Sequence, residues 1–265
     1  MNRSDDTRHG FFFRNCLKSP FRIEKPLLSA TLKKMQPMER KNGKLIVLEG
    51  IDGSGKGTQT HLLTERLARE GVETAAISFP QYGKKSAGLI EEYLNGKYGD
   101  TGPYAASLFY AVDRFDASIE LRKLLAEGRI VILDRYVDSN AGHQGAKISD
   151  VAARERFLEW LYDIEYKILG VPEPDIVLIL TIDPKTAQSN VGKKETRAYL
   201  EAGKTHDLLE ADTAHLKKAQ DSYLWLAKKH PENHILIECM DAEIFMPPDK
   251  IHEKIWNAIT SVLRT

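Results

Sequence analysis

The stretch that decides the fold is KLIVLEGIDGSGKGT, residues 44–58. Its first part contains an apolar run, residues 45–48, which predicts a buried strand. The second part, residues 50–57, matches the pattern GxxxxGK, and a helical pattern that buries Leu62, Leu63 and Leu67 follows it. A strand, a glycine-rich turn, a lysine and a helix in this order are what a phosphate-binding loop requires.

The residue types of this loop suit a nucleoside triphosphate. Glycine tolerates positive φ angles, so successive backbone N–H groups can turn inward onto phosphate oxygens. A helix that begins near Lys56 adds the positive end of its dipole, and Lys56 itself supplies a full charge. We therefore predict that the loop binds ATP through Gly50, Asp52, Gly53, Ser54, Gly55, Lys56, Gly57 and Thr58.

Beyond the loop, apolar runs alternate with helical patterns. Further strands are expected at residues 74–79, 130–133, 176–182 and 235–237. Apolar strands separated by helices are typical of a parallel sheet covered on both faces. We predict one three-layer α/β domain, residues 44–265, with a five-stranded parallel sheet. One of its helices, capped by Asp150 and ended by Gly170, is expected to bury Phe157, Leu158, Leu161, Ile164 and Ile168.

Composition excludes several classes of protein. The 265 residues include 38 basic and 38 acidic side chains, a balance that argues against a nucleic-acid binder. The longest apolar run, residues 176–180, is far shorter than the roughly 20 residues that cross a bilayer. Cys16 and Cys239 form no CxxC pair, so neither a zinc site nor a disulfide framework is indicated. We expect a cytoplasmic protein without nucleic-acid or membrane partners.

Residues 1–43 differ from the rest, because basic side chains outnumber acids and no periodic pattern is present. A disordered extension is one interpretation. A start codon placed too early is another, since Met35 and Met38 precede the first strand. An organelle transit peptide also fits the basic bias, although Asp5 and Asp6 weaken it.

Four segments together carry a family resemblance. They are LEGIDG at 48–53, FPQY at 79–82, YAVDR at 110–114 and DRYVDSN at 134–140. In this order and spacing they resemble the thymidylate kinases, and the loop GSGKGTQ at 53–59 is similar to those of nucleoside monophosphate kinases in general. The resemblance implies ATP-dependent phosphorylation of dTMP to dTDP, in nucleotide biosynthesis. It also implies a P-loop kinase fold with a short lid at about 190–207, Mg²⁺ as cofactor and a homodimer.

The acceptor site can be assigned from the same segments. Tyr110 and Arg114 are four residues apart on a helix, so they share a face where a ring and a guanidinium can recognise a base. A core tyrosine beside a salt-bridged arginine is the alternative. The resemblance implies that Tyr110 stacks on thymine and that Arg114 meets its O4 edge. The predicted dTMP-binding residues are Asp52, Phe79, Tyr82, Tyr110, Arg114, Arg135, Asn140 and His143.

Charge for phosphoryl transfer is expected from two places. Asp134 and Arg135 follow the third strand directly, where ligands gather in parallel sheets. Arg135 can hold a phosphate bidentately, although a structural ion pair is the alternative. By resemblance to the mobile lid, Arg197 and Lys204 face the transferring phosphate. The predicted catalytic residues are Lys56, Arg135, Arg197 and Lys204, and the predicted metal-binding residues are Asp52 and Asp134.

Gly57 departs from the general phosphate-loop pattern, whereas Gln81, His143 and the pair Leu208 and Leu209 depart from the family pattern. Gly57 stands where such loops usually carry a Ser or Thr for magnesium, and Thr58 is the nearest substitute. Gln81 stands where many relatives have an arginine near the acceptor phosphate, and Lys84 or Lys85 could compensate. His143 stands where relatives carry an aromatic residue near the sugar.

Other functions remain open from the sequence. Another nucleoside monophosphate kinase or a deoxynucleoside kinase is the nearest alternative, although the latter usually shows Glu-Arg-Ser after the third strand. A nucleotide-binding protein without transferase activity is the alternative from a different class. The presence of both Arg114 and Arg135 disfavours it, because a lost acceptor site is its expected mark.

Overall fold

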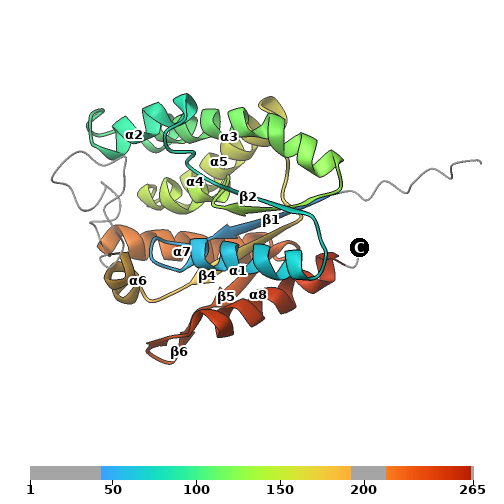
Figure 1. Ribbon diagram of the computed structural model, residues 1–265. Coiled ribbons are helices and arrows are strands. Elements are labelled where there is room, and N and C mark those ends of the chain that lie inside the picture. The colour runs from blue at the N-terminus through green and yellow to red at the C-terminus, as the bar shows by residue number, and fades with distance from the viewer. Residues whose placement is uncertain (1–42, 192–212, 264–265) are drawn as a thin grey trace, which may run out of the picture. The chain divides into compact units, whose positions relative to one another are not determined.

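The chain forms a five-stranded, fully parallel sheet in a computed structural model that describes residues 43–191 and 213–263 (Figure 1). The order across the sheet is β2-β3-β1-β4-β5. This confirms the predicted sheet and the three-layer α/β fold. The strands are β1 (Lys44–Glu49), β2 (Thr74–Ser78), β3 (Ile130–Asp134), β4 (Ile176–Thr181) and β5 (His234–Glu238).

Helices cover both faces of the sheet (Figure 1). Two of them pack on one face and bury the even-numbered residues of β1, such as Ile46 and Leu48. Three others pack on the opposite face, over Leu45 and Val47. The first pair is α1 (Lys56–Arg69) and α8 (Pro248–Leu263), and the second group is α3 (Pro103–Ala126), α5 (Val151–Tyr162) and α7 (Thr213–Lys229).

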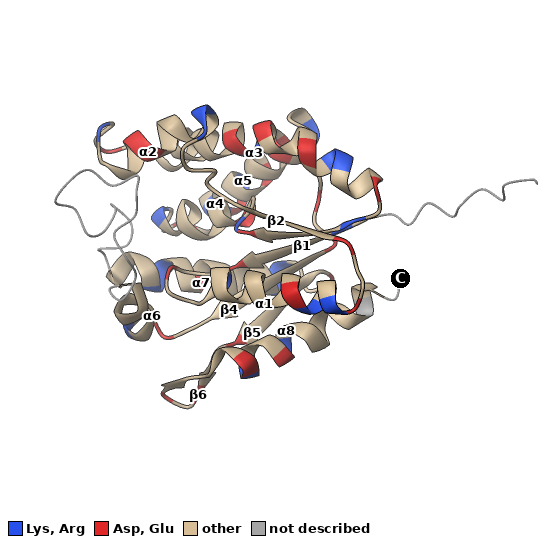
Figure 2. Cartoon of the chain, viewed as in Figure 1, with Lys and Arg blue, Asp and Glu red and all other residues tan. Residues whose placement is uncertain are grey.

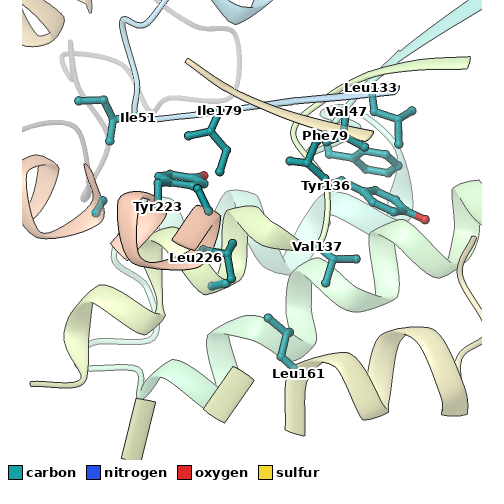
Figure 3. Packing of buried hydrophobic residues seen from close by; sticks show 14 of the residues in the cluster. Val47, Ile51, Phe79, Leu133, Tyr136, Val137, Leu161, Ile179, Tyr223 and Leu226 are labelled. Atoms are coloured by element: carbon teal, nitrogen blue, oxygen red, sulfur yellow. The ribbon is translucent and has the colours of Figure 1, made fainter. Parts of the chain in front are cut away.

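Period-two alternation in the central strand therefore divides the core into two layers. Figure 3 shows part of the second layer, in which Tyr223 of α7 lies near Ile51 and Ile179. Because β1 has apolar neighbours on both sides and both faces, its carboxyl end is a rigid support for the loop that follows. Charged residues lie mainly on the helices and loops, as Figure 2 shows.

The topology places the loop after β1 next to the turn after β3. β1 pairs with β3 from Lys44 opposite Ile130 to Leu48 opposite Asp134, so both strands end at the same level. After β1 the chain forms the edge strand β2, places β3 between β2 and β1, and then crosses to the other side of β1 to form β4 and β5. Parallel sheets bind ligands at such a reversal, beyond the carboxyl ends of the strands.

The short helix α2 (Gly88–Leu94) falls where the sequence pattern predicts a helix, at about residues 86–94. Four other short elements were not predicted: α4 (Asp138–His143), α6 (Pro184–Val191), β6 (Met240–Asp241) and β7 (Ile244–Phe245). A signal for α6 exists, because the Asp183 carboxylate accepts from Thr186 N at 3.0 Å and Pro184 follows it. An acidic cap before a proline is a helix start.

The helix after Asp150 corrects one expectation. Asp150 does cap it, accepting from Ala153 N at 2.7 Å. From Asp163 to Ile168, however, the backbone widens into a π-helix. The wider turn rotates the side chains, so Glu165 is buried and Ile168 is 66% exposed. The prediction that Ile168 continues the buried face is wrong for that reason.

No helix among the described residues is both long and apolar enough to span a membrane. The extension of residues 1–43 lies almost wholly outside the described residues, as does most of the proposed lid.

Candidate active site

The loop between β1 and α1 has the backbone of a phosphate cradle. Gly50, Gly53 and Gly55 all have positive φ, and Gly55 directly precedes the first residue of α1. Gly53 has a second, steric reason to be glycine, because a Cβ there would lie 2.1 Å from the carbonyl oxygen of Ala187 in α6. Asn190 of α6 also donates to Gly53 O at 3.1 Å. The unpredicted helix α6 thus supports the loop from outside and leaves no room for a side chain at position 53.

Lys56 is buried against the loop that it follows. Its ammonium donates to Gly50 O and Ile51 O, each at 2.9 Å. Burial lowers the pKa of Lys56 to about 8, with the charge of Arg135 acting in the same direction. Phosphate oxygens are the natural replacement for these carbonyl partners, since an ammonium bound to phosphate gains a full opposite charge.

The outer side of the loop borders a hollow lined by Gly53, Gly55, Gly57, Thr58, Asn190 and Phe245. The four loop residues in this set belong to the predicted ATP-binding group. Phe245 of β7 was missed, because no local pattern brings this hairpin to the loop. Its ring lies 3.7 Å from the place of a Cβ on Gly55.

On the other side of the loop lies a pocket that is partly open to solvent. All eight predicted dTMP-binding residues line it: Asp52, Phe79, Tyr82, Tyr110, Arg114, Arg135, Asn140 and His143. The structure therefore brings together residues that are spread from position 52 to position 143. The lining residues that sequence reasoning missed are Pro80, Leu94, Tyr136, Ser139 and Gln144.

Arg135 lies at the junction of the loop and this pocket. Its guanidinium pairs with Asp52 Oδ1 at 2.7 Å and is 3.1 Å from His143 Nε2. Its backbone is left-handed, with φ of 70°, which costs a non-glycine residue about 1–2 kcal/mol. The burial of His143, together with the charge of Arg135, holds the pKa of its imidazole well below the usual value. His143 is therefore neutral and can accept from Arg135.

Arg114 is held by a partner from the π-helix. Its Nε lies 3.0 Å from each of the two carboxylate oxygens of Glu165, and its Nη2 also contacts Glu165. Nη1 donates to Tyr136 O at 3.2 Å. Arg114 is thus both salt-bridged, as the alternative interpretation expected, and part of the pocket lining. A bidentate partner fixes the plane of the guanidinium.

The walls for a flat ring come from α3 and from the segment after β2. Tyr110 lines the pocket with its ring edge-on to Tyr93, at 6.4 Å between centroids. Phe79 packs on Tyr136 at 5.8 Å. Asn140, which is 2% exposed, donates to Ser107 O at 3.2 Å, so its amide is oriented by the backbone of α3.

Gln81 does not line this pocket. Its backbone N–H and its side-chain amide both donate to Asp113, at 2.8 and 3.2 Å. Lys84 donates to Gln81 Oε1 at 2.5 Å. Gln81, at the position where the family resemblance implies an arginine, therefore joins the segment after β2 to α3.

Two carboxylates were predicted to bind metal. The Asp134 carboxylate lies beside the start of α1, 3.4 Å from where a Cβ on Gly57 would be. Asp52 is engaged with Arg135. Over residues 43–191 and 213–263, no three His, Cys, Asp or Glu side chains converge as a metal site. Arg197 and Lys204 lie outside the described residues, so their predicted roles stay predictions.

Comparison with known families gives a direct match. The family model described as thymidylate kinase matches residues 48–241. A thymidylate kinase of Mycobacterium tuberculosis is 33% identical over 186 residues, which is 69% of this chain and 85% of the relative. A probable thymidylate kinase of Methanococcoides burtonii is 32% identical over 225 residues, or 84% and 99% of the two chains.

Solved structures agree with this match. Thymidylate kinase from Candida albicans superposes with a TM-score of 0.64 at 25% identity, covering 83% of this chain and 92% of that one. The structure from Ehrlichia chaffeensis, with a TM-score of 0.59 at 23% identity, shares the fold.

Proposed function

The chain belongs to the thymidylate kinase family and phosphorylates dTMP to dTDP with ATP as donor, and from this premise we propose how its side chains divide the work. The observation that carries the proposal is the pocket beside the loop, which is lined by all eight predicted acceptor residues. Donor and acceptor then meet at Arg135 and Lys56. Phosphoryl transfer depends mainly on such positioning and on positive charge around the moving group.

On the donor side, the loop binds the outer phosphates of ATP. Its N–H groups and the start of α1 supply partial positive charge, and Lys56 exchanges its carbonyl partners for phosphate oxygens. Thr58 is exposed at the hollow beside Gly57 and is placed to contact the same phosphates.

On the acceptor side, Arg135 holds the phosphate of dTMP and Asp52 meets the sugar. Their ion pair of 2.7 Å orients the guanidinium, and neutral His143 supports it from the other side. Tyr110 stacks on thymine, while Arg114, fixed by Glu165, meets the O4 edge. Asn140 bonds the base, and Phe79 and Tyr82 complete the walls.

Mg²⁺ fits this site as a companion of ATP. In proteins Mg²⁺ is usually held through one or two carboxylates together with substrate phosphates and water. Asp134 beside Gly57 is the carboxylate best placed to hold it, and Asp52 is the second. When bound, the ion neutralises charge on the transferring phosphates. Arg197 and Lys204 are proposed to add positive charge from the lid.

A second copy of this chain is proposed to pack on α3. Leu108, Val112, Phe115 and Ile119 are each at least 43% exposed and fall at i, i+4, i+7 and i+11. This spacing forms one apolar stripe along the helix. A stripe on a 24-residue helix can pack against its own copy about a two-fold axis, as most homodimers do. A cytoplasmic location is proposed from composition alone.

A coupled assay of ADP release over dTMP, dUMP, AMP, CMP and GMP tests the assignment of the pocket. We expect the highest kcat/KM for dTMP. We expect the pocket wall around Phe79 and Tyr82 to contact the 5-methyl group of thymine. Because one such group typically contributes about 1–3 kcal/mol to discrimination, kcat/KM for dUMP should be about 10- to 200-fold lower. A higher kcat/KM for AMP or GMP than for dTMP would show that the pocket does not recognise thymine.

A further inference from the structure

Glu49 ends β1 with its carboxylate wholly inside the protein, and nothing in the proposed chemistry uses it. A buried carboxylate is costly unless it is fully hydrogen-bonded. Here three donors satisfy it. Oε1 accepts from Tyr136 N at 2.7 Å, and Oε2 accepts from Ser139 Oγ at 2.7 Å and from Tyr223 Oη at 2.8 Å.

These donors come from three different elements. Tyr136 is the residue after Arg135, Ser139 belongs to α4, and Tyr223 belongs to α7, the helix that follows the proposed lid. Glu49 itself directly precedes Gly50 of the loop. One carboxylate therefore joins the donor loop, the turn that carries Arg135 and two helices beneath the site.

The contact with Tyr136 N has a specific consequence for Arg135. The left-handed backbone of Arg135 is held from both sides, because Arg135 N donates to Leu48 O at 2.9 Å and the next N–H donates to Glu49. Strained conformations persist only where their surroundings hold them. Without an acceptor at position 49, the peptide after Arg135 loses its partner and the turn is free to relax.

We propose that Glu49 is a positioning residue, which fixes the turn at Arg135 and thereby aims its guanidinium at the acceptor phosphate. The inference rests on the proposed role of Arg135. Burial, together with the nearby charge of Asp138, raises the pKa of Glu49, which agrees with a carboxylate held for its hydrogen bonds at an electrostatic cost.

Steady-state kinetics of variants at positions 49, 135 and 223 tests this. Glu49→Ala removes the acceptor, and we expect KM for dTMP to rise about 10- to 100-fold, since a small misplacement near the reacting groups can cost about 100-fold. KM for ATP should stay within about threefold. A role only in folding would lower kcat through the fraction of active enzyme and leave both KM values unchanged, and that result overturns the proposal.

Two further variants separate the hydrogen bond from the charge. Glu49→Gln keeps an oxygen for Tyr136 N, and its amide can donate to the hydroxyls of Ser139 and Tyr223, which rotate to accept. We expect this variant to restore KM for dTMP to within about threefold of the wild type. Tyr223→Phe removes one donor and leaves the contact with Tyr136, so it should also stay within about threefold. If Glu49→Ala does not fold, Glu49→Met, which fills the volume without an acceptor, replaces it.

A double-mutant cycle with Arg135→Lys completes the test. Since lysine aims its charge by a flexible stem, adding Glu49→Ala to Arg135→Lys should cost little further kcat/KM for dTMP. If the losses in kcat/KM from the two single substitutions multiply fully in the double variant, Glu49 does not act through Arg135. That result overturns the positioning role of Glu49 and leaves the role of Arg135 intact. An Arg135→Lys variant with wild-type kinetics for dTMP overturns the role of Arg135, and the inference with it.

Discussion

Three charged side chains around the loop are largely withdrawn from solvent. Asp52 and Arg135 are paired at 2.7 Å, with 16% and 15% of their side chains exposed, and Lys56 is 6% exposed. A buried charge without its partner is strongly destabilised. Substrate phosphates therefore enter a site where positive charge is already desolvated and oriented, which strengthens its interaction with developing negative charge.

Replacement of Lys56 by alanine should abolish most turnover while leaving the fold intact. Removing one preorganised charge from a transition state costs about 100- to 1,000-fold in kcat. The measurement is kcat with saturating ATP and dTMP, beside a circular dichroism spectrum. Lys167→Ala is the matched control, because Lys167 is 77% exposed on the π-helix and should behave as wild type. An active Lys56→Ala enzyme would falsify the role of the loop lysine.

The acidity of Lys56 predicts a pH dependence. Its pKa is lowered to about 8 by burial and by the charge of Arg135, so the free enzyme loses this ammonium as the pH rises through about 8. We expect kcat/KM for ATP, which reports the free enzyme, to decline over this interval. Bound phosphate stabilises the ammonium, so kcat at saturation should decline at higher pH. Values of kcat/KM that stay flat from about pH 7 to about pH 9 contradict this prediction.

Short helices contribute to the site together with the long helices α1 and α3. α4 carries Asn140 and His143 to the acceptor pocket, and α6 presses on the loop at Gly53. A helix of six residues has too few internal hydrogen bonds to be stable alone. α4 is held by packing against α7, where the ring of Tyr223 lies on Gly142.

A methyl group at position 142 tests this packing. A Cβ on Gly142 would lie 2.4 Å from the ring of Tyr223, so Gly142→Ala should destabilise the protein by about 1–3 kcal/mol. Gly88→Ala is the control, because Gly88 is helical with nothing within 4 Å of its Cβ position. We expect that control to be neutral or stabilised by up to about 1 kcal/mol. Urea unfolding measures both, and equal midpoints would show that α4 and α7 tolerate greater separation.

At the scale of the whole molecule, the two faces of α3 have different tasks. The inward face contributes Tyr110 and Arg114 to the acceptor pocket, while the outward stripe is apolar and exposed. A second copy on this stripe would order the same helix that carries the two residues proposed to bind the base. Assembly and substrate binding would then share one element.

Phe115→Asp should therefore weaken the proposed dimer and leave the monomer folded. A charge in the middle of an apolar interface is left desolvated without a partner, which disfavours association. Sedimentation velocity at micromolar concentration measures the shift to monomer. Ile244→Asp is the control, because Ile244 is 73% exposed on the β6–β7 hairpin and away from the stripe. If the wild-type protein sediments as a monomer, the proposed dimer is wrong.

The five strands, the loop and the cap at Asp150 were predictable from the sequence, as was the convergence of the eight proposed acceptor residues on one pocket. Each depends on a local signal, either an apolar run, a glycine pattern or a short motif, and the parallel topology then brings the motifs to one edge of the sheet. Glu165 and Tyr223 were not predictable in this way. They meet their partners Arg114 and Glu49 across 51 and 174 residues, and no periodicity records such a contact. Which motifs the chain carries was thus determined by the sequence, whereas the packing of α6, α7 and the π-helix decided how the charges of the site are held.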